Sequence, residues 1–290
     1  MTSSAGGGQL VVVATPIGNL GDVSARAVDV LTRADHVCCE DTRRTRALLS
    51  ALGVSAGARL VAVHQHNERA RAAQVAGWVA AGRTVALVSD AGTPAVSDPG
   101  ALVVAAVIER GLTVSAVPGP SAVLAALVVS GLPTDRFCVE GFLPRKGTDR
   151  RRRLDLVAAE RRTTVLLEAP NRLAATLADL VAACGEGRPV VVARELTKRH
   201  EEVWRGSLGA ALVEFAAREV RGEVVVVLGG GSAPPPPADD ELRRALGELL
   251  GAGDGVRRAA DEVASATGVS RRRTYALAVE LQAEGRGSPS

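Results

Sequence analysis

The stretch from Ser89 to Gly100 has the composition of a ligand-binding loop, with two glycines and two prolines among its twelve residues. Glycine lets a backbone come close to a bound group, proline stiffens a loop, and the Asp90 carboxylate can accept a hydroxyl or attract a cation. The valine-rich segment 84–88 before it indicates a buried strand, and the apolar run 101–108 after it indicates a buried helix. The loop therefore lies at the carboxyl end of a strand, where open α/β sheets bind ligands. A tight strand–helix turn with acidic caps would have the same composition.

Two further predicted strands also end in glycine-containing turns. The segment 15–22 follows an apolar run, but it lacks the GxGxxG pattern of a dinucleotide-binding turn. The segment 118–122 follows another apolar run, and Ser121 can cap the helix that comes next. Since the amino end of a helix attracts anions, this second turn suits a carboxylate.

The elements that position these loops alternate between strand and helix. In the first half of the chain, short apolar runs predict strands, and periodic apolar positions predict the helices between them. We expect strands at 10–14, 36–39, 60–63, 84–88 and 112–117, and helices at 23–32, 69–81, 101–108 and 123–129. Such alternation favours a mostly parallel sheet.

A second alternation begins after Gly131–Thr134, with strands expected at 137–141, 164–168, 189–195 and 223–228 and helices at 150–159, 172–183 and 208–218. Four consecutive prolines predict a stiff linker. Beyond it, Gly268 lies between two helical patterns, as in a helix–turn–helix. The predicted fold class is α/β, with two α/β domains and a cleft between them, plus a small helical C-terminal tail domain. The expected bounds are 1–9 for a disordered lead, 10–130 and 134–230 for the two domains, 231–240 for the linker and 241–283 for the tail.

The composition excludes several classes of protein. The longest unbroken apolar runs have eight residues, far short of the ~20 that span a bilayer. No Lys or Arg precedes Arg26, so no signal peptide is expected. The four cysteines, Cys38, Cys39, Cys138 and Cys184, lack the spacing of metal ligands and are expected as buried thiols of a cytoplasmic protein without a metal site.

Seven segments, taken in order, resemble one protein family. They are Thr15–Asn19, Glu40–Arg43, His66–Glu68, Ser89–Gly100, Pro118–Ala122, Glu168–Arg172 and Arg194–Lys198. Over about residues 10–230 they resemble the ribosomal RNA ribose methyltransferases of the tetrapyrrole methylase superfamily. The resemblance implies that superfamily's fold, S-adenosylmethionine as methyl donor, and 2′-O-methylation of a cytidine ribose in 16S ribosomal RNA. Leu167 and Asn171 depart from the family pattern, in which an aromatic residue and a histidine are common at these places.

The resemblance, together with the charge of helix amino ends, also implies a cofactor site. Asp90 is expected near the polar or cationic part of the cofactor, and Ser121 is expected near its carboxylate. The expected cofactor-binding residues are Pro16, Asp90, Ala91, Gly92, Val96, Ser121 and Ala122. For Pro16 and Val96, ordinary loop packing is the alternative.

Removing the proton of a ribose hydroxyl calls for a base, which typically contributes ~10²–10⁴-fold to the rate. Glu168, at a strand end, is the candidate catalytic residue. Glu40 and Glu68 are rivals, and Lys198 could stabilise the developing alkoxide. An ordinary ion pair, such as one between Glu40 and Arg43, is the alternative for each.

Basic clusters predict where RNA would bind. From Arg145 to Arg153 six residues are basic and one is acidic, which favours contact with phosphates, although a solvated helix face would have the same charge. The expected RNA-binding residues are Arg43, Arg145, Lys146, Arg172 and Lys198. Arg271–Arg273 in the tail could bind RNA or support packing. Because aromatic residues make up only 2% of the chain, base recognition by stacking on many rings is not expected.

The expected partners are 16S ribosomal RNA, in the assembled small subunit, and a second copy of the chain, since family members pair as homodimers. Two other functions stay open: methylation of a small tetrapyrrole, and RNA binding or ribosome assembly without catalysis. The basic run at 145–153 argues against the first. The intact loops at 90–92 and 118–122 argue against the second.

Overall fold

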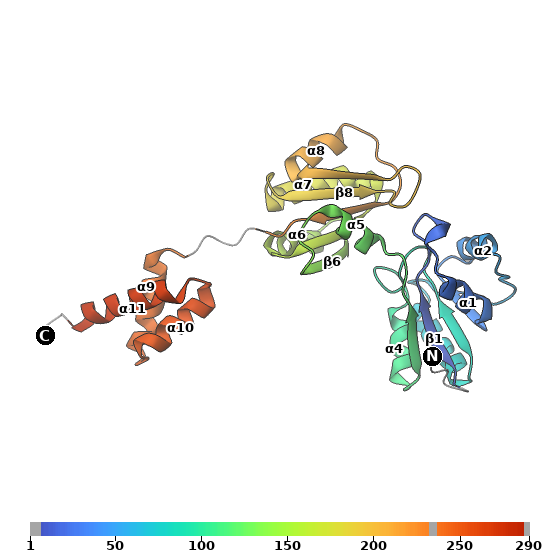
Figure 1. Cartoon of the computed structure of the whole chain (residues 1–290), viewed down its shortest axis with the longest axis horizontal. Coiled ribbons are helices and arrows are strands. Elements are labelled where there is room, and N and C mark those ends of the chain that lie inside the picture. Colours follow the sequence, from blue (N-terminus) through green and yellow to red (C-terminus); the bar gives the residue numbers. More distant parts are fainter. Residues whose placement is uncertain (1–6, 232–236, 287–290) are drawn as a thin grey trace. The chain divides into compact units, whose positions relative to one another are not determined.

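The computed structural model describes residues 7–231 and 237–286, and the chain divides into two compact units, 1–231 and 232–290. The larger unit contains two five-stranded sheets with helices around them (Figure 1). Of the expected disordered lead, residues 1–6 lie outside the described part of the chain, and the first strand already begins at Gln9.

The first sheet is entirely parallel, as the alternation of strands and helices predicts, and its strand order is β3-β2-β4-β1-β5. Its strands are β1 (Gln9–Val13), β2 (His36–Cys39), β3 (Leu60–Ala62), β4 (Thr84–Leu87) and β5 (Thr113–Val117). The helices of this half are η1 (Leu20–Asp22), α1 (Ala25–Arg33), α2 (Thr42–Ala51), α3 (Glu68–Ala80), α4 (Ala101–Glu109) and α5 (Ala122–Ser130).

Helices cover both faces of this sheet, which is why its central strands are continuous apolar runs. Helices α1 and α2 pack on one face through Leu31 and Leu49. Helices α3 and α4 pack on the other through Val75 and Val103. After the neighbouring strands β1 and β4, the chain therefore continues to opposite faces of the sheet, and the loops that follow these two strands diverge. Such a switch point creates a crevice at the carboxyl ends of the strands.

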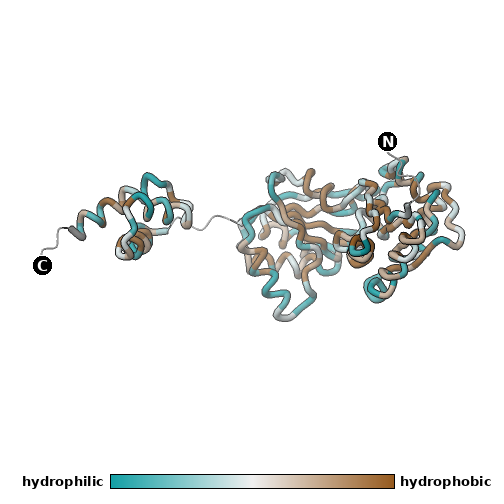
Figure 2. The backbone as a smooth tube through the Cα atoms, turned by 90° about the horizontal axis from the view of Figure 1, so that it is seen from below, coloured by the Kyte–Doolittle hydropathy of each residue, from teal (hydrophilic) through white to brown (hydrophobic). Residues whose placement is uncertain are grey.

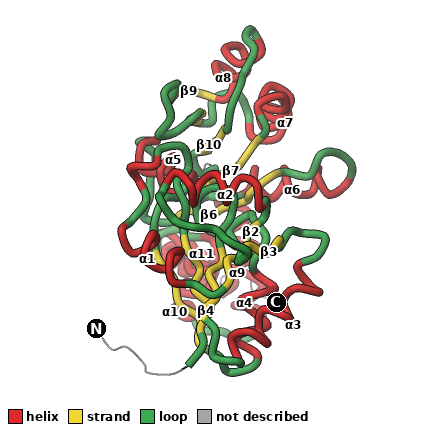
Figure 3. Tube along the Cα trace, turned by 90° about the vertical axis from the view of Figure 1, so that its right-hand side faces the viewer, coloured by secondary structure: helices red, strands yellow, loops and turns green. Residues whose placement is uncertain are grey.

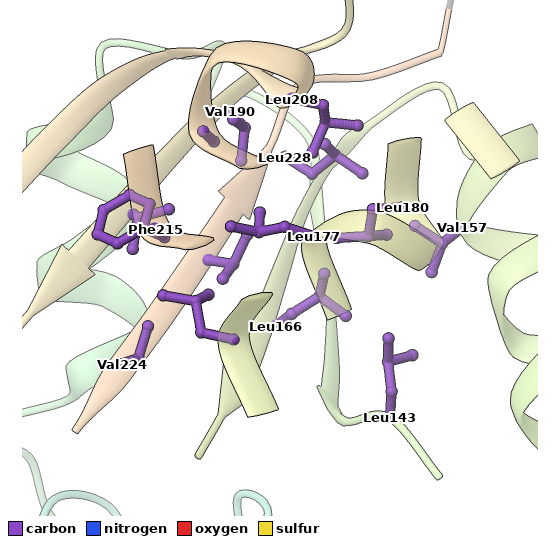
Figure 4. Close-up of a cluster of buried hydrophobic side chains, with 14 of the residues drawn as sticks. Leu143, Val157, Leu166, Leu177, Leu180, Val190, Leu208, Phe215, Val224 and Leu228 are labelled. Atoms are coloured by element: carbon purple, nitrogen blue, oxygen red, sulfur yellow. The ribbon is translucent and has the colours of Figure 1, made fainter. Parts of the chain in front are cut away.

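The second sheet is mixed, with the order β6-β7-β10-β8-β9 and a single parallel pair, β6 with β7. Its strands are β6 (Phe137–Phe142), β7 (Thr163–Glu168), β8 (Pro189–Arg194), β9 (Glu202–Ser207) and β10 (Val224–Leu228). Its helices are α6 (Thr148–Ala159), η2 (Pro170–Arg172), α7 (Leu173–Cys184) and α8 (Leu208–Ala216). Figure 3 shows α7 and α8 on the same side of these strands, and Figure 4 shows the core between them, with Leu177, Leu208 and Phe215 facing Leu166 and Val190.

Helix α5 belongs to both halves of the larger unit. It begins at the end of β5 of the first sheet, yet Val123, Ala126 and Leu127 pack against the other face of the second sheet, on strands β7, β8 and β10. Figure 1 shows α5 beside that sheet. The expected boundary at 131–134 assigns this helix to the first domain, whereas its apolar side chains complete the core of the second sheet.

The observed strands and helices of the larger unit agree with the expected ranges to within one or two residues, but helix α2, strand β9 and the short helices η1 and η2 were missed. Helix α2 carries three arginines and few apolar residues, so its periodicity is weak. Asp41 starts it by accepting a hydrogen bond from the Arg43 amide. Strand β9 lies at the edge of its sheet, where partial exposure removes the need for an apolar run.

The tail forms a separate unit of three helices, α9 (Asp239–Gly251), α10 (Val256–Thr267) and α11 (Arg271–Arg286). Gly268 ends α10 with a φ of 71°, a conformation that favours glycine, as the helix–turn–helix pattern predicts. In Figure 2 the helices of this unit alternate between apolar and polar segments. Leu242, Leu246 and Ala278 form its own core. Of the expected linker, residues 232–236 lie outside the described part, and α9 already begins at Asp239.

The composition also gave expectations about membrane helices, metal sites and cysteines. Among residues 7–231 and 237–286, no helix has both the length and the apolar character needed to cross a membrane, and no cluster of His, Cys, Asp and Glu could hold a metal ion. All four cysteines are free, but only Cys38 and Cys39 are buried. Burial raises the pKa of the Cys38 thiol to about 12. Cys138 and Cys184 are half-buried, so the expectation of four buried thiols was wrong for these two.

The buried carboxylate of Glu68 caps helix α4. Its Oε1 accepts hydrogen bonds of 2.8 Å from the amides of Gly100 and Leu102. This placement gives Glu68 a structural task and removes it from the candidates for the catalytic base.

We predict that Glu68→Ala lowers the free energy of unfolding by about 2 kcal/mol, because it leaves two amides without their acceptor. Urea denaturation measures the loss. The exposed Glu109→Ala at the far end of α4 is the matched control and should change stability by less than about 0.5 kcal/mol. Equal effects for the two variants would contradict the capping role.

Candidate active site

A cavity of about 430 Å³ lies where the strand ends of the first sheet meet α5 and the second sheet. This volume is within the range of pockets that hold small molecules. The residues that line it are Ile17, Glu40, Arg44, Asp90–Thr93, Val96, Asp98, Ser121–Val123, Phe142, Leu167–Pro170 and Gly222–Val225. Segments that are far apart in the sequence therefore share one hollow.

The cavity brings together most of the residues that the sequence singled out for a cofactor and for catalysis. These are Asp90, Ala91, Gly92, Val96, Ser121, Ala122 and Glu168, together with the rival Glu40. Pro16 is not among the lining residues. Its neighbour Ile17 takes that place, because the Ile17 side chain packs beside the core residues of α5 next to the cavity.

Hydrogen bonds join the three loops that end β1, β4 and β5. Thr15 and Gly92 form a backbone bridge, with N–O distances of 2.9 and 3.1 Å, and the Thr93 hydroxyl donates to the Pro120 carbonyl at 3.2 Å. Gly92 has a φ of 77°, and a Cβ at this position would lie 3.3 Å from the Ile17 side chain. Both the backbone conformation and the close neighbour therefore favour glycine at this position.

The loop after β4 is also strained. Ala95 and Ser97 have φ values of 65° and 64°, which side-chain-bearing residues adopt at a cost of roughly 1–3 kcal/mol each. Gly141 of strand β6 accommodates this loop, since a Cβ on Gly141 would lie 2.9 Å from the Ser97 hydroxyl. Unusual backbone conformations of this kind concentrate at ligand sites.

Three of the carboxylates that line the cavity, those of Glu40, Asp90 and Asp98, come from loops of the first sheet. Burial raises the pKa of Glu40, and the neighbouring Asp90 and Asp98 raise it further. Burial also raises the pKa of Asp98, with a smaller contribution from Asp90. Asp90 is held in place by the Asp41 amide at 3.1 Å and by Arg44 at 3.2 Å. Carboxylates gathered away from water favour a bound cation.

The amino end of α5 gives the cavity an opposite charge. The Ser121 hydroxyl caps the helix by accepting from the Leu124 amide, and Ala122 and Val123 of the first turn line the cavity. The first amides of a helix have no partner within it and carry the positive end of the helix dipole. The cavity can therefore hold a zwitterion, with its anionic end at α5 and its cationic end near the carboxylates.

The Glu168 carboxylate is buried and fully engaged. One oxygen accepts from the Ala169 amide at 2.8 Å and lies 3.3 Å from the Arg172 guanidinium, and the other accepts from the Thr176 hydroxyl at 2.6 Å. The alternative of an ion pair between Glu40 and Arg43 is not formed, because Arg43 pairs with Asp41.

The structure separates the basic residues expected to bind RNA. Arg145 and Arg172 line a second cavity, which shares Phe142 and Ala169 with the first. Lys146 is exposed, and so is Arg43. Lys198 is half-buried and pairs with Glu195 at 2.9 Å and Glu223 at 3.3 Å.

Not every residue of the basic run at 145–153 faces solvent. Arg150 is buried, where it binds Asp179, the Thr176 hydroxyl and the Pro144 carbonyl. In the tail, Arg271 pairs with Asp261 and Arg273 with Asp239, both within that unit.

Sequence reasoning missed the lining residues that come from the second sheet, chiefly Phe142 and Gly222–Val225. Gly222 carried a weak signal, as a glycine immediately before an apolar strand. Phe142 is the last residue of strand β6, as Glu168 is of β7.

Comparisons with known proteins agree with this geometry. The family model described as Tetrapyrrole (Corrin/Porphyrin) Methylases matches residues 9–212. The Ribosomal RNA small subunit methyltransferase I of Synechocystis sp. is 43% identical over 280 residues, 96% of this chain and 100% of that protein. The protein of the same name from Mycobacterium tuberculosis is 46% identical over 278 residues, 96% of each chain. The chain belongs to the ribosomal RNA small subunit methyltransferase I family, within the tetrapyrrole methylases.

A solved structure shares the fold of this methyltransferase I family member. It is the uroporphyrin-III C-methyltransferase from Thermus thermophilus complexed with S-adenyl homocysteine. Its TM-score is 0.53 at 23% identity, over 77% of this chain and 97% of that one. At this identity the likeness supports the fold alone.

The raised pKa of Asp98 predicts how stability depends on pH. Because the folded state disfavours the Asp98 carboxylate, this group destabilises the protein as the pH rises through its folded-state pKa. Asp98→Asn should therefore raise the unfolding temperature at pH 7, and the gain should shrink toward about pH 4, where an ordinary aspartate becomes protonated. The exposed Asp155→Asn is the control and should show no such trend. A gain that is the same at both pH values would contradict this account.

Proposed function

We propose that this chain transfers a methyl group from S-adenosylmethionine to the 2′-hydroxyl of a cytidine in 16S ribosomal RNA. The observation that carries the proposal is the single cavity shared by the acidic strand ends and the amino end of α5, in a chain of this family. The basic side chains of Arg145 and Arg172 beside the cavity favour RNA over a tetrapyrrole substrate.

The cavity fits S-adenosylmethionine group by group. The first turn of α5 suits the carboxylate of the cofactor, and the carboxylates of Asp90 and Asp98 suit its ammonium and sulfonium charges. Val96, Leu167 and Val225 supply apolar surface for the adenine. When bound, S-adenosylmethionine supplies an electrophilic methyl group on a sulfonium ion.

The chain must position the ribose hydroxyl and accept its proton. Well-oriented reactants can gain ~7–11 kcal/mol from positioning alone. We propose Glu40 as the proton acceptor, because its pKa is raised and a base works best with a pKa near the working pH. Since both Glu168 oxygens are already hydrogen-bonded, we assign Glu168 to holding Arg172 and the Ala169 turn in place.

The substrate is proposed to be the assembled small subunit. Exposed Arg43, Arg145 and Lys146 suit phosphates rather than bases, so these three residues respond to the charge and shape of the RNA backbone. Lys198 lies farther from the solvent and already pairs with two glutamates, which makes it a weaker RNA contact than Arg145.

Mass mapping of ribose methylation tests the proposed function. The purified chain is incubated with S-adenosylmethionine and either naked 16S ribosomal RNA or small subunits that lack the modification. We expect one methylated cytidine ribose, formed in the subunits. Failure to modify either RNA, with transfer to a tetrapyrrole instead, would contradict the proposal.

Glu40→Gln tests the proton acceptor in the same assay. The wild-type rate should rise with pH through the raised pKa of Glu40, because only the carboxylate form accepts a proton. Glu40→Gln should lower kcat by roughly 10²–10⁴-fold and abolish this rise. Glu168→Gln is the matched comparison and should retain the pH dependence. If Glu168→Gln loses it and Glu40→Gln does not, the roles are reversed.

The outer face of α5 supports a homodimer. Leu124 and Val128 lie one turn apart on this helix and are 50% and 71% exposed, and β5 is an edge strand of its sheet. Adjacent exposed apolar side chains on a helix favour a protein interface.

We predict that Val128→Asp converts a dimer to a monomer in light scattering. Val213→Asp, at an equally exposed valine of α8 (73%), is the control and should leave the dimer intact. A wild-type monomer, or a dimer that survives Val128→Asp, would contradict this interface.

A further inference from the structure

A second cavity, of about 570 Å³, adjoins the cofactor cavity and shares Phe142 and Ala169 with it. Arg145, Asn171 and Arg172 supply its polar side chains. Phe142 is therefore the aromatic side chain at the boundary between the two cavities.

A β-bulge directs Phe142 to this boundary. Strand β6 pairs regularly with β7 from Phe137 to Val139, then skips Glu140 and resumes with Gly141 opposite Leu166 and Phe142 opposite Leu167. Successive side chains of a strand alternate between faces, so one extra residue moves all later ones to the opposite face. Without the bulge, Phe142 would point toward helices α6 and α7. With it, Phe142 lies beside Leu167, on the face that lines the cofactor cavity.

Phe142 remains unusually exposed for a phenylalanine. Its exposed fraction is 55%, in a chain that has only three phenylalanines. Gly141, with a φ of 65°, allows the strand to pass close to Ser97 just before the ring. The backbone thus adopts a bulge and a left-handed glycine next to a ring that stabilises no core. This arrangement suits a ring that contacts a ligand.

The surrounding groups have the chemistry of a nucleotide site. Unpaired RNA bases stack on aromatic rings, and arginines bind the flanking phosphates. Arg145 is exposed at this cavity, and Arg172 is held there by Glu168 and by the Leu143 carbonyl. The Asn171 amide has a donor and an acceptor side by side, which complements the amino group and ring nitrogen of cytosine.

We propose that Phe142 is the stacking platform for the base of the target nucleotide, which occupies the second cavity while its ribose reaches the first. This inference rests on the proposed function, because it concerns the RNA substrate of the same site. It assigns Phe142 to RNA binding rather than to the cofactor.

Steady-state kinetics with small subunits test the platform. Phe142→Ala should raise the KM for the subunit about 5- to 100-fold, the range expected for loss of one stacked base. Phe142→Tyr should stay within about threefold of wild type, because it keeps the ring. Phe142→Leu should behave like Phe142→Ala, because it keeps apolar bulk without a ring. Phe137→Ala is the matched control, since Phe137 lies on the same face of the same strand but lines neither cavity.

Calorimetric titration with S-adenosylhomocysteine separates RNA binding from cofactor binding, and its affinity should change by less than about twofold in every variant. An unchanged KM in Phe142→Ala, full activity in Phe142→Leu, or a parallel loss of S-adenosylhomocysteine affinity would overturn the platform. If Phe142→Ala fails to fold, as judged by circular dichroism, the KM values of Phe142→Tyr and Phe142→Leu still test the platform. A wild-type protein that modifies no RNA would refute the proposed function itself.

Discussion

The backbone bridge between Thr15 and Gly92 is the constraint on which the site depends. Strands β1 and β4 are neighbours whose chains leave toward opposite faces of the sheet, so the loops after them tend to separate. Two hydrogen bonds between these residues hold the loops together, and the buried Thr15 hydroxyl adds a third to the Ser89 carbonyl. The crevice thereby becomes a cavity that both Ile17 and Asp90 line.

Helix α5 supplies the other half of the site by serving two sheets at once. Its amino end faces the cavity, where its dipole suits an anion, while Val123 and Leu127 are buried against the second sheet. The same helix therefore ties the wall made by the second sheet, including Leu167 and Val225, to the loops of the first. In the proposed function, the donor and the acceptor of the methyl group lie in these adjoining cavities.

Much of this could be predicted from the sequence because the signals are local. Apolar runs located nearly every strand, and Ser121 was recognised as a cap from its type and place. The residues that were missed depend on contacts between distant segments. No local pattern reveals the bulge at Glu140, the commitment of Glu68 to helix α4, or the hydrogen bonds that occupy Glu168. The sequence alone does not distinguish the candidate carboxylates, because the partners of each one depend on the fold.

The central claim is that the bridged loops and α5 together hold one molecule of S-adenosylmethionine. Calorimetric titration with S-adenosylhomocysteine, for the wild type and for Gly92→Val, tests it most directly. We predict one molecule bound per chain and at least a tenfold loss of affinity in Gly92→Val, because a branched side chain at a φ of 77° would strain the bridge and crowd Ile17. No binding by the wild type, or undiminished binding by a folded Gly92→Val, would contradict the account.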